Sequence, residues 1–270
     1  MDKNAPIGIF DSGIGGLTVA RAVHQILPHE RLIYFGDTAH LPYGEKSSAA
    51  IQSYSVKITD VLISEGCKAI VIACNSASAA AFDLVKEYAA SKSKVINVID
   101  PMVDHVIANF QGKHVGLIGT RRTVQSNTYV EKIHAKDPQF KLSSLTTALL
   151  VPMIEEGFIK NQISHDIISN YLDDDSIRGI NALILGCTHY PLIKNEIELH
   201  YKNKVKALDS SEIVARNLQQ YLIVNDLLAD KRAGAGLNKF FVSDYTDSFE
   251  SLTKRFFGEQ IHLVKYRLWE

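Results

Sequence analysis

The sequence has few cysteines, almost no net charge and no long hydrophobic run. Three cysteines in 270 residues are too few, and odd in number, for a disulfide framework. The formal net charge of −1 gives no reason to expect a nucleic-acid or membrane partner, and basic pairs such as Arg121-Arg122 are isolated. The N-terminus lacks the features of a signal peptide, and no apolar stretch approaches the roughly 18 residues that span a bilayer. These absences predict a cytoplasmic protein with reduced thiols.

The sequence does have an ordinary globular composition and a regular alternation of segments. Its 46% hydrophobic and 22% charged residues argue against disorder. Short β-branched runs alternate with longer helical stretches, which is typical of an α/β protein with parallel sheets. We expect strands at 7–10, 32–35, 69–73, 94–98, 114–118, 182–185, 204–207 and 240–242, helices at 17–26, 49–65, 76–90, 126–136, 163–172 and 210–225, and a flexible loop at 230–236.

A weak internal repeat divides the chain. Residues 7–12 and 115–120 each consist of a short strand and a small or polar turn, and a cysteine ends an apolar run at a similar distance after each. We expect two similar open parallel-sheet α/β domains that face each other across a cleft, with pseudo-two-fold symmetry. The first comprises residues 1–97 and 208–270, and the second comprises residues 98–207. Chance similarity between α/β units is the alternative explanation.

Cys74 and Cys187 are the most informative residues because each one ends a short apolar run. Ligands bind at the carboxyl ends of strands in open α/β sheets, and N–H groups at a helix start lower the pKa of a thiol. Asn75 and Ser76 are candidates to cap the following helix or to contact substrate. A single buried cysteine is more often an inert hydrophobe. Two of them, one in each half, indicate paired thiols on opposite sides of one substrate.

Polar residues near Cys187 add to this candidate site. Thr188 supplies a hydroxyl, and His189 can act as acid or base near neutral pH. A hydrogen-bonded histidine that caps the strand end is the alternative interpretation. Glu155 and Glu156 form a further polar pair, which is either a solvated helix end or a source of one carboxylate near Cys187.

Two loops in the first half carry other candidates. Asp11 opens a glycine-rich turn whose spacing is not G-x-G-x-x-G, and its charge would repel a pyrophosphate. We therefore interpret Asp11 as a polar partner beside a reacting centre. In the loop at 40–47, Tyr43 and nearby N–H groups are candidates to bind a ligand carboxylate. A turn with a half-buried tyrosine is the alternative.

Metal and cofactor chemistry have no motif in the sequence. No C-x-x-C or H-E-x-x-H occurs, and the ten histidines are scattered without ligand spacing. A pyridoxal-phosphate enzyme would need a Schiff-base lysine in a phosphate-binding setting, and no lysine stands out. A protease-type Cys–His nucleophile would leave Cys74 without a role. We expect no metal and no cofactor.

Together these segments resemble the glutamate racemase family of the cofactor-independent Asp/Glu racemase superfamily. The motifs follow one another over nearly the whole chain: residues 8–16, Gly36-Asp37 with Pro42-Tyr43-Gly44, residues 73–77 and residues 185–191. The resemblance implies an enzyme that interconverts L- and D-glutamate and supplies D-glutamate for peptidoglycan. It also implies a homodimer that needs no cofactor.

The resemblance implies specific roles for these residues. Cys74 and Cys187 match the two acid/base thiols, Asp11 matches the carboxylate that assists the first, and Glu155 and His189 match groups near the second. Ser76 stands where the family commonly has threonine, so the hydroxyl is retained. We expect substrate contacts from Asp11, Ser12, Pro42, Tyr43, Gly44, Asn75, Ser76, Thr120, Thr188 and His189.

Two alternatives stay open. A racemase for aspartate would differ in cleft geometry, which the sequence does not show. A binding protein that holds an acidic amino acid between two domains would not need paired cysteines. Racemisation needs two acid/base groups, which paired cysteines supply, because the Cα proton leaves from one face and another arrives at the opposite face.

Overall fold

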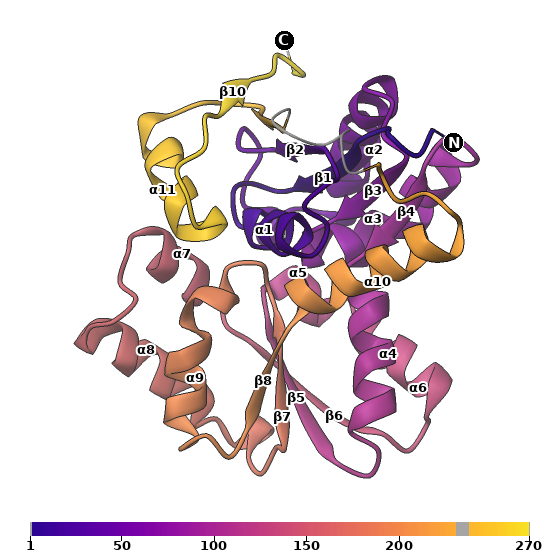
Figure 1. The fold of residues 1–270 in the computed structure, drawn as a ribbon. Coiled ribbons are helices and arrows are strands. Elements are labelled where there is room, and N and C mark those ends of the chain that lie inside the picture. The colour runs from indigo at the N-terminus through magenta and orange to yellow at the C-terminus, as the bar shows by residue number, and fades with distance from the viewer. Residues whose placement is uncertain (1, 231–237, 270) are drawn as a thin grey trace.

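The protein contains two parallel β-sheets with helices packed around them (Figure 1). The computed structural model describes residues 2–230 and 238–269, so most of the loop predicted at 230–236 lies outside the described residues. All strand pairs in both sheets are parallel. The predicted α/β class is therefore confirmed. We call the six-stranded sheet with its helices the first lobe, and the four-stranded sheet with its helices the second lobe.

The first sheet has the strand order β10-β9-β2-β1-β3-β4, and the second has the order β6-β5-β7-β8. The strands of the first are β1 Ile7–Asp11, β2 Leu32–Gly36, β3 Ala69–Ile72, β4 Lys94–Asn97, β9 Lys239–Val242 and β10 Val264–Lys265. Those of the second are β5 His114–Gly119, β6 Lys141–Thr146, β7 Ala182–Gly186 and β8 Lys206–Asp209.

Helices connect the strands, and α10 packs against both α1 and α4 as the chain returns to the first lobe. In chain order the helices are α1 Leu17–Ile26, α2 Ser48–Ser64, α3 Asn75–Ala89, α4 Ile99–Asn109, α5 Arg121–Gln125, α6 Thr128–Lys136, α7 Leu150–Glu155, α8 Gln162–Leu172, α9 Lys194–His200, α10 Ser210–Val224 and α11 Asp247–Phe257. Short 3₁₀ turns are η1 Tyr43–Glu45, η2 Asp175–Ile177 and η3 Tyr190–Ile193. The domain boundaries at 97/98 and 207/208 stay a prediction.

Several elements differ from the sequence prediction. Strand β8 begins at Lys206 rather than at residue 204. Strand β6 was not predicted, because its sequence KLSSLT is half polar and lies at the sheet edge, where side chains are only partly buried. Helix α4 was also missed, since Pro101 lies in its first turn, a position that tolerates proline but resembles a break.

The two sheets repeat one topology, which supports the internal repeat. The order β2-β1-β3-β4 in the first matches β6-β5-β7-β8 in the second. Ile7 pairs with Ala69, and Val115 pairs with Ala182 in the equivalent strands. Each cysteine lies five residues after the alanine of its own strand, so Cys74 and Cys187 occupy equivalent positions.

The central strands are buried along their whole length, so their ends are rigid supports for side chains. Every residue of β1, β2, β3 and β7 is buried. Their sequences are apolar apart from Tyr34 and Asp11, which makes Asp11 the one carboxylate in these strands. Within the described part of the chain, no helix is both long and apolar enough to cross a membrane.

Candidate active site

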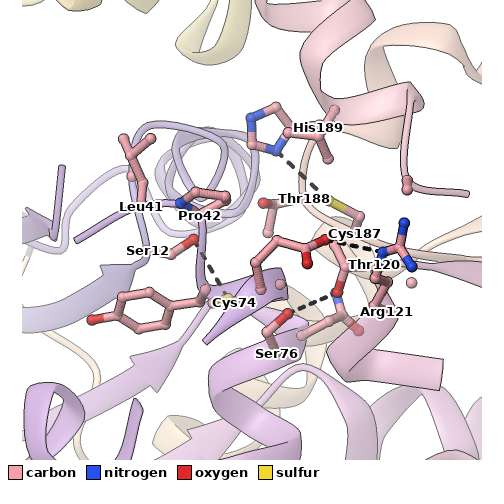
Figure 2. A pocket seen from close by; sticks show the side chains of 18 of the residues that line it. Ser12, Leu41, Pro42, Cys74, Ser76, Thr120, Arg121, Cys187, Thr188 and His189 are labelled. Carbon is pink, nitrogen blue, oxygen red and sulfur yellow. Dashed lines mark hydrogen bonds and ion pairs between the residues drawn. The ribbon is translucent and has the colours of Figure 1, made fainter. Parts of the chain in front are cut away.

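A cavity of about 300 Å³ lies between the lobes, where the central strands of both sheets end. Ser12 follows β1, Cys74 follows β3, Thr120 follows β5 and Cys187 follows β7, and all four line the cavity. The carboxyl edge of a parallel sheet is the usual place for a ligand. Figure 2 shows these four residues approaching the cavity from the two lobes.

The cavity brings together all of the predicted site residues except Asp11. The lining includes Ser12, Pro42, Tyr43, Gly44, Cys74, Asn75, Ser76, Thr120, Glu155, Cys187, Thr188 and His189. It also includes residues that sequence reasoning missed, namely Gly13, Leu41, Glu45, Arg121, Thr147, Ala148, Val151, Pro152 and Gly186. Five of these nine adjoin a predicted residue in sequence, and one of the five, Arg121, was set aside as part of an isolated basic pair.

Cys74 is a buried thiol at the start of α3. Its Sγ accepts a hydrogen bond from the N–H of Ala77 at 3.4 Å and donates to Ser12 Oγ at 3.7 Å. Burial, and then the negative charge of Asp11, raise the pKa of the Cys74 thiol to about 12. Cys74 is therefore protonated at neutral pH in this structure.

Asp11 is completely buried behind this thiol and does not line the cavity. Its Oδ2 accepts a hydrogen bond from the N–H of Gly13 at 3.0 Å, and its Oδ1 has no partner among the described residues. Burial raises the pKa of Asp11, while the charge of His189 and nearby N–H groups oppose this increase. Asp11 thus lies outside the cavity lining, and its negative charge is one cause of the raised pKa of Cys74.

Cys187 belongs to a chain of three ionisable groups. His189 Nδ1 lies 3.7 Å from Cys187 Sγ, and His189 Nε2 lies 2.9 Å from Glu155 Oε1. Burial lowers the pKa of His189, but its hydrogen bonds and charge interactions with Cys187 and Glu155 raise it to about 10 overall. His189 is therefore a cation at neutral pH beside the Cys187 thiol. The contact with His189 also identifies Glu155, rather than the exposed Glu156, as the carboxylate of this site.

Residues of the first lobe pack against the imidazole of His189. A Cβ on Gly15 would lie 2.4 Å from Cε1 of the His189 ring, so only glycine permits this close approach. The Phe256 ring packs edge-on against the imidazole at a centroid distance of 5.1 Å. Thr18 Oγ1 donates to the carbonyl oxygen of Thr188 at 3.0 Å. The glycine-rich turn thus supports contact between the lobes.

The remaining polar lining offers hydrogen bonds to a ligand. Asn75 Oδ1 accepts from the Tyr129 hydroxyl at 2.9 Å, while the buried Asn75 Nδ2 has no partner among the described residues. The hydroxyls of Ser76 and Thr120 lie 2.9 Å apart across the lobe boundary. These groups can bind a polar ligand that enters the cavity.

The geometry qualifies the predicted role of Tyr43. The Tyr43 hydroxyl donates to Asp37 Oδ2 at 2.6 Å, so this loop offers its backbone N–H groups, rather than that hydroxyl, to a ligand carboxylate. In residues 2–230 and 238–269, no group of three or more histidine, cysteine, aspartate and glutamate side chains is arranged to hold a metal ion.

Comparisons with known proteins agree with this geometry. The family model described as Asp/Glu/Hydantoin racemase matches residues 17–218. A glutamate racemase of Chlorobium phaeobacteroides is 41% identical over 252 residues, which cover 93% of this chain and 92% of the relative. A crystal structure of glutamate racemase from Francisella tularensis in complex with D-glutamate matches at a TM-score of 0.92 and 40% identity, covering 99% of both chains. A glutamate racemase isoform from Bacillus anthracis matches at a TM-score of 0.90 and 34% identity, covering 98% of both chains. The resemblance indicated by the sequence motifs is confirmed.

Proposed function

Because the chain belongs to the Asp/Glu/Hydantoin racemase family, we propose that it is a glutamate racemase that uses Cys74 and Cys187 as its two acid/base groups. Curated relatives at 38–41% identity over nearly the full chain are glutamate racemases, which favours glutamate over aspartate as substrate. The observation that carries the mechanism is the placement of two buried thiols at equivalent positions of repeated lobes, on one cavity.

In the proposed reaction, the Cα of glutamate lies between the two sulfur atoms. The Cys187 thiolate removes the Cα proton from one face and becomes a thiol. The Cys74 thiol donates its proton to the opposite face and becomes a thiolate. The product has inverted configuration, and the enzyme is then ready to convert the opposite enantiomer by the reverse exchange.

The charge that develops next to Cα needs stabilisation by preorganised donors. The N–H groups at the start of α3 lie beside Cys74, and the unpaired amide Nδ2 of Asn75 is buried in the same wall. We assign the α-carboxylate of glutamate to these donors. Donors fixed before the reaction stabilise developing charge without reorganisation.

The biological setting follows from the same proposal. D-Glutamate made by this enzyme would be supplied to peptidoglycan synthesis. The expected cytoplasmic location and homodimer stay predictions, as does activity without a cofactor.

The test is circular dichroism of L-glutamate in D₂O with purified protein and no added cofactor. Cys74→Ser and Cys187→Ser are assayed in parallel, and deuterium at Cα is read by mass spectrometry. Loss of optical activity with deuterium uptake in the wild-type protein supports the proposal, provided that either substitution abolishes the loss of optical activity. Activity on aspartate alone changes the substrate but keeps the mechanism. Binding of glutamate without exchange identifies a binding protein.

A further inference from the structure

Two adjacent arginines of the second lobe, Arg121 and Arg122, contact the loop at residues 40–47 of the first lobe. The contact is close, because a Cβ on Gly44 would lie 2.9 Å from Thr120 Cβ. Arg122 binds the carbonyl oxygen of Lys46 through Nε at 3.1 Å and through Nη2 at 2.7 Å. This pair of hydrogen bonds anchors the loop from outside the cavity.

Arg121 differs from its neighbour because it lines the cavity itself. Its Nε forms a single ion pair with Glu45 Oε1 at 3.3 Å, and both side chains are more than half exposed. Figure 2 shows Arg121 next to Thr120, at the end of the dashed line for this pair. An exposed ion pair with one long contact contributes little to stability and is easily exchanged.

Arg121 is the permanently charged cation of the cavity lining that a dicarboxylate ligand can use. Glu155 is paired with His189, and Glu45 is paired with Arg121. No other arginine or lysine occurs among the described residues that line the cavity. Glutamate carries two carboxylates, and the α-carboxylate must stay near the reacting carbon between the thiols. The second carboxylate extends two methylene groups away, and a guanidinium can bind it through charge-assisted hydrogen bonds.

We propose that Arg121 binds the distal carboxylate of glutamate and that Glu45 occupies this guanidinium until the substrate displaces it. The inference rests on the proposed glutamate racemase function. Arg121 is then a specificity-determining residue that selects a second carboxylate, with the backbone N–H groups of the Tyr43–Glu45 turn beside it. Glu45 is an internal competitor for the same cation, so removing the two side chains changes substrate binding in opposite directions.

Steady-state kinetics of Arg121→Gln and Glu45→Gln test this proposal. Loss of a charge-assisted hydrogen bond in Arg121→Gln is expected to raise KM for glutamate roughly ten-fold, with kcat nearly unchanged, since the contact lies away from the reacting carbon. Glu45→Gln removes the competitor and is expected to lower KM about two-fold. Arg178→Gln removes the same charge at an exposed ion pair with Asp175 and serves as the control with unchanged KM.

The double variant gives the deciding measurement. If Glu45 acts only by competing for Arg121, Glu45→Gln has no effect on KM once Arg121→Gln is present. An unchanged KM in Arg121→Gln, or an equal effect of Glu45→Gln with and without Arg121, overturns the inference. Arg121→Lys keeps the charge and is expected to keep KM near the wild-type value. A rise in KM as large as that of Arg121→Gln would show that the effect does not come from the lost charge, and it would overturn the inference. A wild-type protein that does not racemise glutamate instead overturns the proposed function.

Discussion

The two thiols occupy equivalent positions in the two lobes, yet their surroundings differ. Cys74 lies in front of the buried Asp11, whose charge acts with burial to keep the thiol protonated. Cys187 lies beside His189, whose pKa is raised to about 10 and which is therefore cationic at neutral pH. In the proposed mechanism, these surroundings suit Cys74 to start as the acid and Cys187 to start as the base.

The fold determines where the two thiols lie, whereas individual neighbouring residues determine their surroundings. The repeated topology places two sulfur atoms on opposite sides of one cavity. The position two residues after the cysteine holds Ser76 in the first lobe and His189 in the second. The repeated topology thus places the two thiols, while the residues that follow each cysteine give it different surroundings. A two-base racemase needs such a difference, because proton removal and proton donation occur in the same turnover.

Removal of either thiol is expected to have the largest effect. Cys74→Ala and Cys187→Ala should each reduce racemisation on the order of 10³-fold, because one face of Cα loses its acid or base. The remaining thiol can still exchange the Cα proton of one enantiomer without inversion. Proton NMR of L- and D-glutamate in D₂O, measured separately, should show that the two variants exchange opposite enantiomers.

Cys67→Ala is the matched control for these variants. Cys67 is a buried free thiol that does not line the cavity, so its loss should leave racemisation intact. Exchange of the same enantiomer by both active-site variants would contradict a mechanism with one thiol on each face.

Replacement of the imidazole should have the second largest effect. His189→Ser gives the second lobe the residue that the first lobe has at Ser76, and it removes the imidazole that lies 3.7 Å from Cys187 Sγ. We expect kcat/KM to fall roughly 100-fold. The fall must be equal for both enantiomers, since their equilibrium constant is unity. The polarimetric rate in both directions checks this, and retention of full activity would show that Cys187 needs no imidazolium.

The sequence predicted the parts of this site that depend on one strand end at a time. Cys74, Cys187 and His189 each lie in or just after an apolar run that is long enough to identify a buried strand. The carboxyl edge of a parallel sheet then determines their common location.

Contacts between lobes could not be predicted in this way. The approach of Gly15 to His189, and the pairing of Glu45 with Arg121, join residues that are far apart in sequence and depend on how the two sheets pack. Strand β6 was missed for a related reason, because its partly exposed edge position removes the apolar pattern that identified the other strands.

Asp11→Asn tests the first lobe alone, with a smaller expected effect. Asparagine retains an acceptor for the Gly13 N–H but removes the charge that raises the pKa of Cys74. The pKa of Cys74 should therefore fall from about 12, and kcat should decrease roughly ten-fold as the thiol becomes less readily reprotonated. Ultraviolet thiolate absorbance against pH, in a Cys67→Ala and Cys187→Ala background, measures this pKa directly. An unchanged or higher pKa would show that Asp11 does not act through its charge.

The smallest expected effect concerns the carboxylate behind the imidazole. Glu155 helps to raise the pKa of His189 to about 10, so the imidazolium is lost only as the pH rises through that value. Glu155→Gln removes one of the groups that raise this pKa, and the alkaline decline in kcat/KM should therefore begin at a lower pH, by about one unit. The exposed Glu156 makes no such contact, so Glu156→Gln should keep the wild-type profile. If both variants moved the profile equally, the shift would reflect the net charge of α7 rather than the bond from Glu155 to His189. A shift in Glu155→Gln alone would show that the contact of Glu155 with His189 helps to keep the imidazole beside Cys187 cationic.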